Sequence, residues 1–236
     1  RVRRAIASEA IAAGLAVLLE KPPAATLGEL EELVAQARVA GTCLFAAWHS
    51  QFAPAVAPAA ALLAGERLTT LAIDWREDVR KWHPGQDWIW EEGGFGVFDT
   101  GVNALSIASA ILPERLVVEA ADLFVPEGRQ APIAAHLHFA GAGRAAVFDW
   151  RETGEEAWSI RVETAAGRSI ALHGGGARLL VDGVEQPLGP FAEYAAIYAR
   201  FAPLVRARAV AVDAEPMRIV ADAALIARRI AANPVE

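Results

Sequence analysis

The 236-residue sequence is poor in cysteine, methionine and tyrosine, with one, one and two of them respectively. A single cysteine, Cys43, cannot form an internal disulfide, and no paired Cys/His spacing typical of a structural zinc site is present. No apolar run is long enough to cross a bilayer, and nothing resembles a signal peptide. We therefore expect a cytoplasmic protein without a metal site and without a membrane partner.

The sequence also lacks an excess of positive charge. It has 22 Lys and Arg residues against 29 Asp and Glu residues, a formal net charge of −7, and the charges are scattered. A nucleic-acid-binding surface needs clustered basic residues, so this balance argues against nucleic acid as a main partner. Hydrophobic residues make up 54% of the chain, which is enough to form a large buried core.

The first 47 residues alternate between helical and strand patterns. Residues 5–13 follow helical spacing, and the apolar stretch 15–19 predicts a short buried strand. Thr26-Leu27-Gly28-Glu29 has the form of a capping box and predicts a helix that Gly41 closes, and residues 42–47 predict a second strand. Apolar strands separated by helices indicate a parallel, doubly wound sheet. Because the sequence starts in what resembles the middle of a helix, we expect a missing N-terminal portion and only the last two strands of this sheet.

From residue 48 the pattern changes. A glycine cluster is followed by a predicted helix that ends near Ile111. Residues 115–185 contain about six short alternating stretches separated by Gly and Pro, which predict a mostly antiparallel sheet. Two helices, over about 190–208 and 214–231, are expected to complete the chain and to bring its end back onto the first sheet. The predicted fold class is α/β followed by α+β with an open sheet.

One motif lies directly after the first predicted strand. This is Glu20-Lys21-Pro22-Pro23, at the edge of the sheet where open α/β folds bind their ligands. A lysine there can donate to a ligand hydroxyl as a cation, or act as a base when it is buried and uncharged. A loop lysine at a strand end without a chemical role fits the same pattern. His49 follows the second predicted strand and is expected at the same edge.

A second motif consists of Gly93-Gly94 and, a few residues later, Asp99-Thr100-Gly101-Val102-Asn103. The glycines permit close approach of the backbone to a ligand. Asp99 and Asn103 are four residues apart, so they share one face of a helix that starts near Gly96. A carboxylate and an amide side by side suit adjacent hydroxyls of a polyol. A first-turn acid that only stabilises the helix dipole is an equally good interpretation.

Tryptophan residues are concentrated in one short segment: four of the seven in the sequence lie from Trp75 to Trp90. Acidic residues, among them Glu77, are interleaved with them, and His83 follows Trp82 directly. Aromatic faces beside acids are typical of carbohydrate sites, because the C–H faces of a sugar pack on rings while its hydroxyls need acceptors. The same tryptophans would equally well anchor a long loop to the core.

Two other patterns do not predict a site. Gly141-Ala142-Gly143-Arg144-Ala145-Ala146 fits a relaxed dinucleotide fingerprint, but a strand pattern follows it where the fingerprint demands a helix, so we predict a hairpin turn. The phosphate-binding loop itself is absent from this sequence. His136 and His138 alternate on one predicted strand, His173 lies far away, and no carboxylate pattern accompanies them, so no metal site is predicted.

The two motifs, about seventy residues apart, together resemble the glucose–fructose oxidoreductase/inositol dehydrogenase/MocA family. Residues 99–107 and Trp82-His83-Pro84 are similar to its branch of galactose and arabinose 1-dehydrogenases. The resemblance covers essentially the whole chain. It implies that residues 1–47 are the C-terminal end of a Rossmann dinucleotide-binding domain without its phosphate loop, and that residues 48–236 form a substrate-binding and dimerisation domain.

The resemblance further implies a dehydrogenase that uses NAD or NADP to oxidise the anomeric C1 hydroxyl of an aldose to the lactone. The implied catalytic residues are Lys21, Asp99 and Asn103, and Glu20, Lys21 and Pro22 lie on the cofactor side. Inositol-type members have histidine where this sequence has Asn103, and an asparagine cannot take a proton. Asp99 or Lys21 is then the base, with Asp99 preferred. An anomeric hydroxyl is more acidic than an ordinary alcohol, so a weaker base suffices.

The remaining substrate-binding residues that the resemblance implies are His49, Glu77, Trp82 and His83. The expected partners are a small aldose and further copies of the chain, in a homodimer or larger homo-oligomer through the open sheet, because an apolar sheet face must be covered. Two alternatives stay open. One is another oxidation within the same family, of a ring alcohol or a dihydrodiol, and the other is a non-catalytic sugar-binding homologue.

Overall fold

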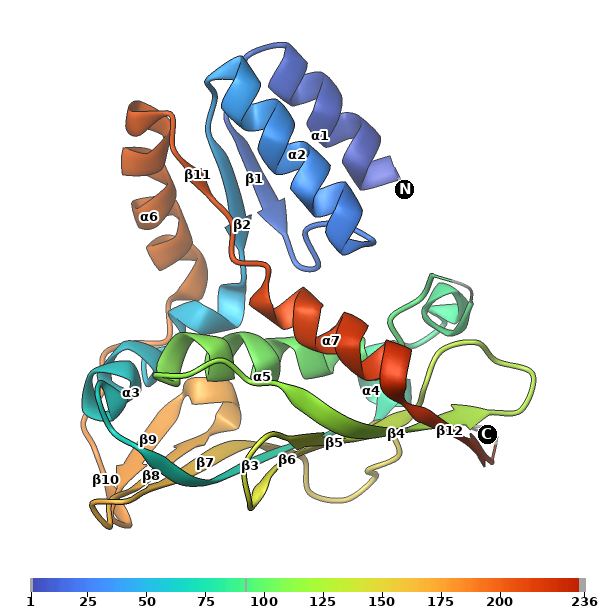
Figure 1. Ribbon diagram of the computed structural model, residues 1–236, viewed down its shortest axis with the longest axis vertical. Coiled ribbons are helices and arrows are strands. Elements are labelled where there is room, and N and C mark those ends of the chain that lie inside the picture. Colours follow the sequence, from blue (N-terminus) through green and yellow to red (C-terminus); the bar gives the residue numbers. More distant parts are fainter. Residues whose placement is uncertain (1, 92, 234–236) are drawn as a thin grey trace.

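Two sheets that share no strand organise the molecule (Figure 1). The computed structural model describes residues 2–91 and 93–233. The smaller sheet is parallel and has the order β1-β2-β11, where β1 is Val17–Glu20, β2 is Leu44–Ala47 and β11 is Val210–Ala211. The first two strands confirm the sequence prediction, with β1 displaced by two residues at its start. The third strand was not expected.

Helices cover both faces of the parallel sheet. Val17, Leu19 and Leu44 pack against α1 (Val2–Ala12) and α2 (Leu27–Ala40). The opposite face packs against α6 (Glu193–Ala207). At the start of α2 the Thr26 side chain accepts a hydrogen bond from the Glu29 amide at 3.2 Å, and Gly41 ends the helix in the left-handed region at φ 59°. The predicted capping residue and helix end are therefore both confirmed.

The larger sheet has nine strands in the order β10-β9-β8-β7-β3-β6-β5-β4-β12. Neighbouring strands are antiparallel except for β3–β6 and β4–β12, which are parallel. The strand bounds are Leu68–Arg76 (β3), Val118–Pro126 (β4), Ala134–Phe139 (β5), Arg144–Asp149 (β6), Ala157–Thr164 (β7), Ser169–His173 (β8), Arg178–Val181 (β9), Val184–Glu185 (β10) and Arg228–Ala232 (β12). The turn between β5 and β6 contains Gly141 and Gly143, both at positive φ, as the hairpin prediction required.

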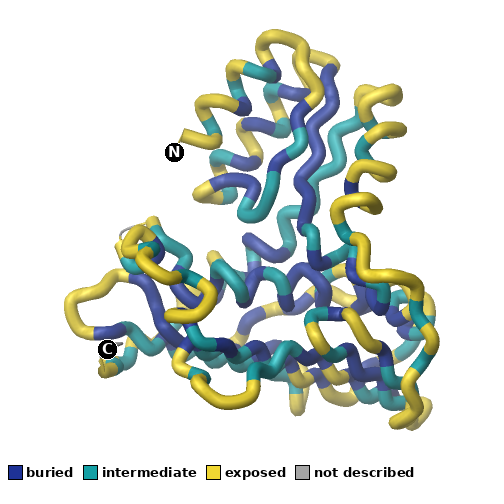
Figure 2. The backbone as a smooth tube through the Cα atoms, turned by 180° about the vertical axis from the view of Figure 1, so that it is seen from behind, coloured by how far each residue is buried: buried dark blue, intermediate teal, exposed yellow. Residues whose placement is uncertain are grey.

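The large sheet is covered on one face only. The helices α3 (Val56–Leu63), α5 (Phe98–Ile111) and α7 (Glu215–Ile226) lie on that face and form the main core with side chains such as Leu71, Ile107 and Phe148. Figure 2 shows the buried residues concentrated along α5 and the strands beneath it. Within the described ranges no helix lies on the opposite face (Figure 1), so the expected open sheet is present.

The end of the chain differs from its prediction. The last helix, α7, ends at Ile226 rather than near residue 231, and residues 228–232 form the edge strand β12 beside β4. An ion pair between Arg228 and Asp122 at 2.9 Å joins these two strands, an interaction that local spacing does not reveal. Met217 of α7 packs with Ala24 and with Leu30 of α2, so α7 does return to the part of the chain that forms the first sheet, as expected.

Short elements complete the architecture. They are η1 (His49–Phe52), α4 (Val79–Trp82), η2 (Asp87–Trp90) and η3 (Gly174–Gly176). η1 connects β2 to α3, α4 and η2 lie in the segment between β3 and α5, and η3 connects β8 to β9. None of the helices within the described residues is long and apolar enough to span a bilayer.

Candidate active site

A cavity of about 370 Å³ lies where the parallel sheet meets the first turn of α5. It brings together segments that are far apart in the sequence: the end of β1, the start of η1, the end of β3 and the glycine-rich start of α5. Seven of the nine residues assigned from the sequence line it, namely Lys21, His49, Glu77, Trp82, His83, Asp99 and Asn103. The other two, Glu20 and Pro22, lie beside Lys21 but not on the cavity wall.

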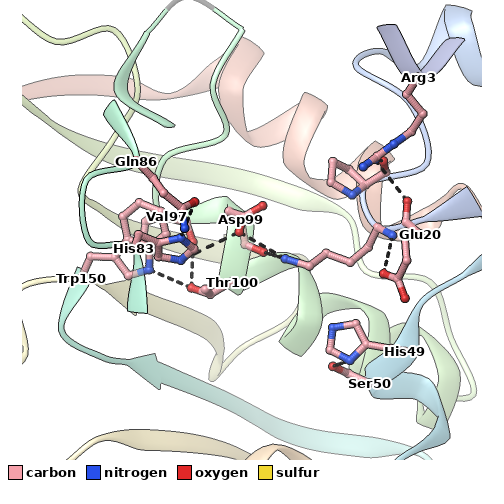
Figure 3. Close-up of polar contacts among 12 residues, drawn as sticks. Arg3, Glu20, His49, Ser50, His83, Gln86, Val97, Asp99, Thr100 and Trp150 are labelled. Carbon is pink, nitrogen blue, oxygen red and sulfur yellow. Dashed lines mark hydrogen bonds and ion pairs between the residues drawn. The ribbon is translucent and has the colours of Figure 1, made fainter. Parts of the chain in front are cut away.

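Lys21 and Asp99 form an ion pair in this cavity (Figure 3). The Lys21 ammonium donates to the main-chain oxygen of Asp99 at 2.7 Å and approaches Oδ2 of the same residue at 3.2 Å. Their side chains are 17% and 14% exposed, so water screens the pair only partly. The cation therefore holds the carboxylate in a fixed orientation with one oxygen edge toward the cavity.

Two glycines determine where Asp99 lies. Gly96 has φ 54°, and a Cβ there would overlap the backbone oxygen of Pro132, while a Cβ on Gly94 would overlap the backbone oxygen of Ile89. Only glycine allows both close approaches. The Asp99 amide then donates to the Gly96 oxygen at 2.8 Å and begins the turn that opens α5. The glycine cluster thus acts through local backbone geometry, which places the carboxylate.

His83 approaches the same carboxylate from the other side (Figure 3). Its Nε2 lies 3.9 Å from Asp99 Oδ2, too far for a direct hydrogen bond, and this buried nitrogen has no partner among the described residues. Its Nδ1 contacts Oε1 of Gln86 at 3.3 Å, and its ring packs on Trp150 with 4.9 Å between centroids. The gap between Nε2 and Asp99 suits a hydroxyl that bonds to both groups.

Glu77 is the most buried carboxylate of the cavity, with 3% of its surface exposed. Its Oε2 accepts a hydrogen bond from Trp158 Nε1 at 3.0 Å, whereas its buried Oε1 has no partner in the part of the chain described. Burial raises the pKa of Glu77 to about 7, although hydrogen bonds from neighbouring groups, Trp158 first, oppose the shift. An unsatisfied buried oxygen beside an open cavity is suited to a ligand hydroxyl.

Indole rings form one wall of the cavity. Trp158 lies between Trp75 and Trp82, with ring centroids 6.1 Å and 5.6 Å away. Trp75 and Trp158 face each other because β3 and β7 are paired in register at these two positions. Glu156 accepts a hydrogen bond from Trp82 Nε1 at 2.7 Å and fixes the outer ring. This wall is suited to the C–H face of a pyranose or to another flat apolar ring.

His49 lies at the end of β2, on the side of the cavity that α6 closes. Its Nδ1 is 3.1 Å from Oε2 of Glu193, in the first turn of α6, and 3.4 Å from the Ser50 hydroxyl. Eight cavity residues were not assigned from the sequence: Ser50, Trp75, Thr100, Trp158, Gly174, Gly175, Phe191 and Glu193. Trp75 carried a signal, because it belongs to the tryptophan-rich segment. Glu193 carried none, since its place depends on helix packing.

Glu20 and Pro22 extend the site along the edge of the parallel sheet. Glu20 Oε2 accepts a hydrogen bond from the Lys21 amide at 3.0 Å, while its buried Oε1 has no partner among the residues described. Arg3 donates to the main-chain oxygen of Pro22. Among the described residues, no group of three or more His, Cys, Asp and Glu side chains is placed to hold a metal ion. The unpartnered Oε1 of Glu20 is suited to a ligand that donates a hydrogen bond.

No family model matches this sequence. It is 43% identical over 231 residues to the galactose 1-dehydrogenase of Pseudomonas fluorescens, which covers 97% of this chain and 74% of that protein. It is 31% identical over 113 residues to trans-1,2-dihydrobenzene-1,2-diol dehydrogenase of Bos taurus, over 45% of this chain and 33% of that protein.

Solved structures agree with these relatives. The crystal structure of a D-galactose-1-dehydrogenase protein from Rhizobium etli superposes with a TM-score of 0.95 at 47% identity, over 100% of this chain and 76% of that chain. A 3-ketoreductase from Actinomadura kijaniata, in complex with NADP, has the same fold, with a TM-score of 0.78 at 19% identity over 98% of this chain and 76% of that chain. These structures confirm the predicted fold class. The chain belongs to the galactose 1-dehydrogenase family.

Proposed function

We propose that this protein is an NAD(P)-dependent dehydrogenase that oxidises the anomeric C1 hydroxyl of an aldose such as D-galactose to the lactone. The observation that carries this proposal is the ion pair between Lys21 and Asp99 in a cavity at the carboxyl ends of the parallel strands. The 43% identity to galactose 1-dehydrogenase supports the reaction and the substrate class. L-Arabinose remains a second candidate substrate, and a cytoplasmic location remains a prediction.

We also propose that the protein belongs to the wider glucose–fructose oxidoreductase/inositol dehydrogenase/MocA family. The boundary between its two domains is proposed to lie at residue 47. Residues 1–47 would contribute to the dinucleotide-binding part and residues 48–236 to the substrate-binding part. The hydrophobic contacts support the division, because the side chains of β1 and β2 pack in clusters separate from the main core of the large sheet. The strand β11 departs from it, since residues 210–211 pair with β2.

The residues beside β1 fit the nicotinamide end of the cofactor. Glu20, Lys21 and Pro22 would hold it, because the buried Oε1 of Glu20 lacks a donor among the described residues and a carboxamide provides one. When bound, NAD(P)⁺ accepts the C1 hydrogen of the sugar together with its electron pair. Lys21, whose ammonium reaches the cavity from the same segment, would lie between this edge and the sugar.

Asp99 is proposed as the acceptor of the C1 hydroxyl proton. Its carboxylate borders the cavity, and the Lys21 ammonium beside it stabilises the negative charge that develops on the C1 oxygen. Asn103, on the same helical face, offers both a donor and an acceptor that orient the hydroxyl and cannot take its proton. His49, Glu77 and His83 would bind other hydroxyls, while the indole wall packs against the C–H face.

The test is NAD(P)H formation by the full-length protein across a panel of aldoses, with Asp99→Ala and Asp99→Asn alongside. We expect activity with galactose or arabinose, and a loss of roughly 10²- to 10⁴-fold in kcat in both variants, because neither can accept the proton. Asp122→Asn, which removes a carboxylate from an ion pair outside the cavity, is the matched control. An Asp99 variant with near-normal turnover would disprove the proposed proton transfer.

A second candidate reaction is the oxidation of a cyclic diol. The three-indole wall accepts a flat apolar ring as well as a pyranose, and the dihydrodiol dehydrogenase of Bos taurus is 31% identical over part of the chain. The same panel should therefore include a trans-1,2-dihydrodiol. Turnover of the diol without turnover of any aldose would favour this second reaction.

A further inference from the structure

Glu193 reaches the cavity from an element that has no other part in the proposed chemistry. It lies in the first turn of α6, and its side chain is 11% exposed. Its Oε2 is 3.1 Å from Nδ1 of His49, whose side chain is 22% exposed and lines the same cavity. The pair is therefore partly shielded from water, and it connects α6 to the end of β2.

The chemistry of this contact determines the proton on the imidazole. A carboxylate oxygen only accepts hydrogen bonds, so Nδ1 of His49 must donate. The neutral ring then has its proton on Nδ1 and presents Nε2 as an acceptor. The Ser50 hydroxyl, 3.4 Å from the same Nδ1, cannot donate to a nitrogen that already carries a proton. Glu193 thus selects one of the two tautomers that a histidine can adopt.

Packing holds both members of the pair in place. Ile197, one turn after Glu193, is 1% exposed and packs with Phe45 and Ala47 of β2, the strand that leads into His49. Tyr194 lies parallel to the imidazole, with 6.4 Å between ring centroids and 8° between planes. Because α6 and β2 share this small core, the distance between the carboxylate and the ring does not depend on two freely moving surface side chains.

We propose that Glu193 is a positioning residue that holds His49 in its Nδ1–H tautomer, so that Nε2 accepts a hydrogen bond from one hydroxyl of the sugar. This inference rests on the proposed function, because it assumes an aldose in the cavity. A hydrogen-bond acceptor in the cavity wall distinguishes sugars that differ at one ring position. It binds a hydroxyl at that position but makes no hydrogen bond when the sugar has only a hydrogen there. Glu193 therefore contributes to sugar specificity through the orientation of the His49 ring.

The experiment compares Glu193→Ala with Glu193→Gln in the full-length protein, using galactose and its 2-, 3-, 4- and 6-deoxy derivatives. Glu193→Ala should raise KM about tenfold and leave kcat within about twofold, because one hydrogen bond away from C1 is lost. Glu193→Gln should remain close to wild type, since its amide oxygen still accepts from Nδ1. Glu185→Ala, which removes an exposed carboxylate paired with Arg178, is the control.

The deoxy sugars identify the hydroxyl. One deoxy sugar should bind about tenfold more weakly than galactose to wild type. Its affinity should not fall further in Glu193→Ala, because the same hydrogen bond is already absent. An unchanged KM in Glu193→Ala would overturn the proposal. Equal losses in the Ala and Gln variants would also overturn it, because they would indicate an effect of charge on α6 and not the orientation of His49.

A second readout is independent of turnover. The ¹⁵N chemical shifts of the His49 ring should show a protonated Nδ1 in wild type and in Glu193→Gln, and a mixture of tautomers in Glu193→Ala. A wild-type ring protonated only on Nε2 would overturn the inference about Glu193. If no aldose is oxidised while the wild-type shifts show Nδ1–H, the proposed function fails and the positioning of His49 by Glu193 stands.

Discussion

Glu77 differs from the other carboxylates of the cavity because it is almost completely buried and yet has one oxygen without a protein partner in the described ranges. Burial raises its pKa to about 7, against hydrogen bonds such as that from Trp158 which lower it. Near neutral pH both forms are therefore populated. The protonated form can donate a hydrogen bond to a sugar oxygen, whereas the ionised form only accepts.

This burial predicts a pH-dependent stability. The folded state binds the Glu77 proton more tightly than the unfolded chain, whose pKa is near the ordinary 4.5. The resulting stabilisation is complete below about pH 4.5 and is lost as the pH rises through about 7. The glutamine of Glu77→Gln cannot ionise. The free energy of unfolding of this variant, relative to that of wild type, should therefore rise by on the order of 3 kcal/mol from about pH 5 to about pH 8.

Urea unfolding at several pH values measures this difference. Glu119→Gln, at an exposed position on β4, is the control and should follow wild type at every pH. Parallel stability curves for wild type and Glu77→Gln would show that Glu77 does not titrate in this range. If the free energy of unfolding of Glu77→Gln fell relative to that of wild type as the pH rises, the effect would have the opposite sign to that expected of a buried acid.

Some site residues were predictable because each lies a fixed number of residues from a strand end or a helix start that the sequence itself indicates. Lys21 follows a buried strand, and Asp99 and Asn103 are one turn apart at the start of a helix. The partners Trp158 and Glu193 had no such signal. Trp158 reaches Glu77 through the β3–β7 register, and Glu193 reaches His49 through the packing of α6 on β2. Local sequence patterns carry no information on these long-range contacts.

At the scale of elements, the segment from Gly94 to Asp99 combines two functions, since it ends a loop and places a carboxylate. Gly96 has a positive φ and lies against the backbone of Pro132, whereas Gly128 has φ 73° with no atom within 4 Å of a Cβ. Both positions strain any L-residue, but only Gly96 adds a collision with main chain that cannot rotate away.

We therefore expect Gly96→Ala to lower the free energy of unfolding more than Gly128→Ala does. The backbone strain alone costs about 1 kcal/mol, and the collision should add roughly 1–3 kcal/mol in Gly96→Ala. Because the collision displaces the start of α5, kcat should also fall in Gly96→Ala and not in Gly128→Ala. Thermal unfolding and NAD(P)H formation measure the two effects. Equal unfolding temperatures for the two variants would contradict this account of the glycine cluster.

The elements that the sequence misassigned depend on distant partners. The two-residue strand β11 exists only because β2 offers an unpaired edge, and residues 228–232 become extended because β4 lies beside them. No helix was predicted in the segment before β3, whereas the structure contains α3 there, whose Val56 and Leu63 pack into the main core. In contrast, α2 was predicted at both ends, since Thr26 and Gly41 act within its own sequence.

At the scale of the whole molecule, the two sheets have opposite surroundings. The parallel sheet has helices on both faces, while the large sheet, as far as residues 2–91 and 93–233 show, has helices on one face only (Figure 1). Small and polar side chains occupy the centre of the uncovered face, where exposed Ala72 lies between Ala145 and Arg161. A face with small central residues allows another sheet to approach closely. We propose that a second copy of the chain covers it. The same oligomer was expected from the sequence on the assumption of an apolar face, whereas the observed centre of the face is small and polar.

This arrangement predicts that Ala72→Lys disrupts the oligomer and leaves the fold intact. The exposed alanine has room for a longer side chain in the monomer, but a lysine beside Arg161 places bulk and like charge at the centre of an interface that must bury on the order of 1,000 Å². Light scattering after size-exclusion chromatography should give at least twice the mass of one chain for wild type and a lower mass for Ala72→Lys. Val39→Lys, at a position 91% exposed on α2, should behave as wild type. A monomeric wild type would overturn the proposed oligomer, and an Ala72→Lys variant of unchanged mass would place the contact between copies on another surface.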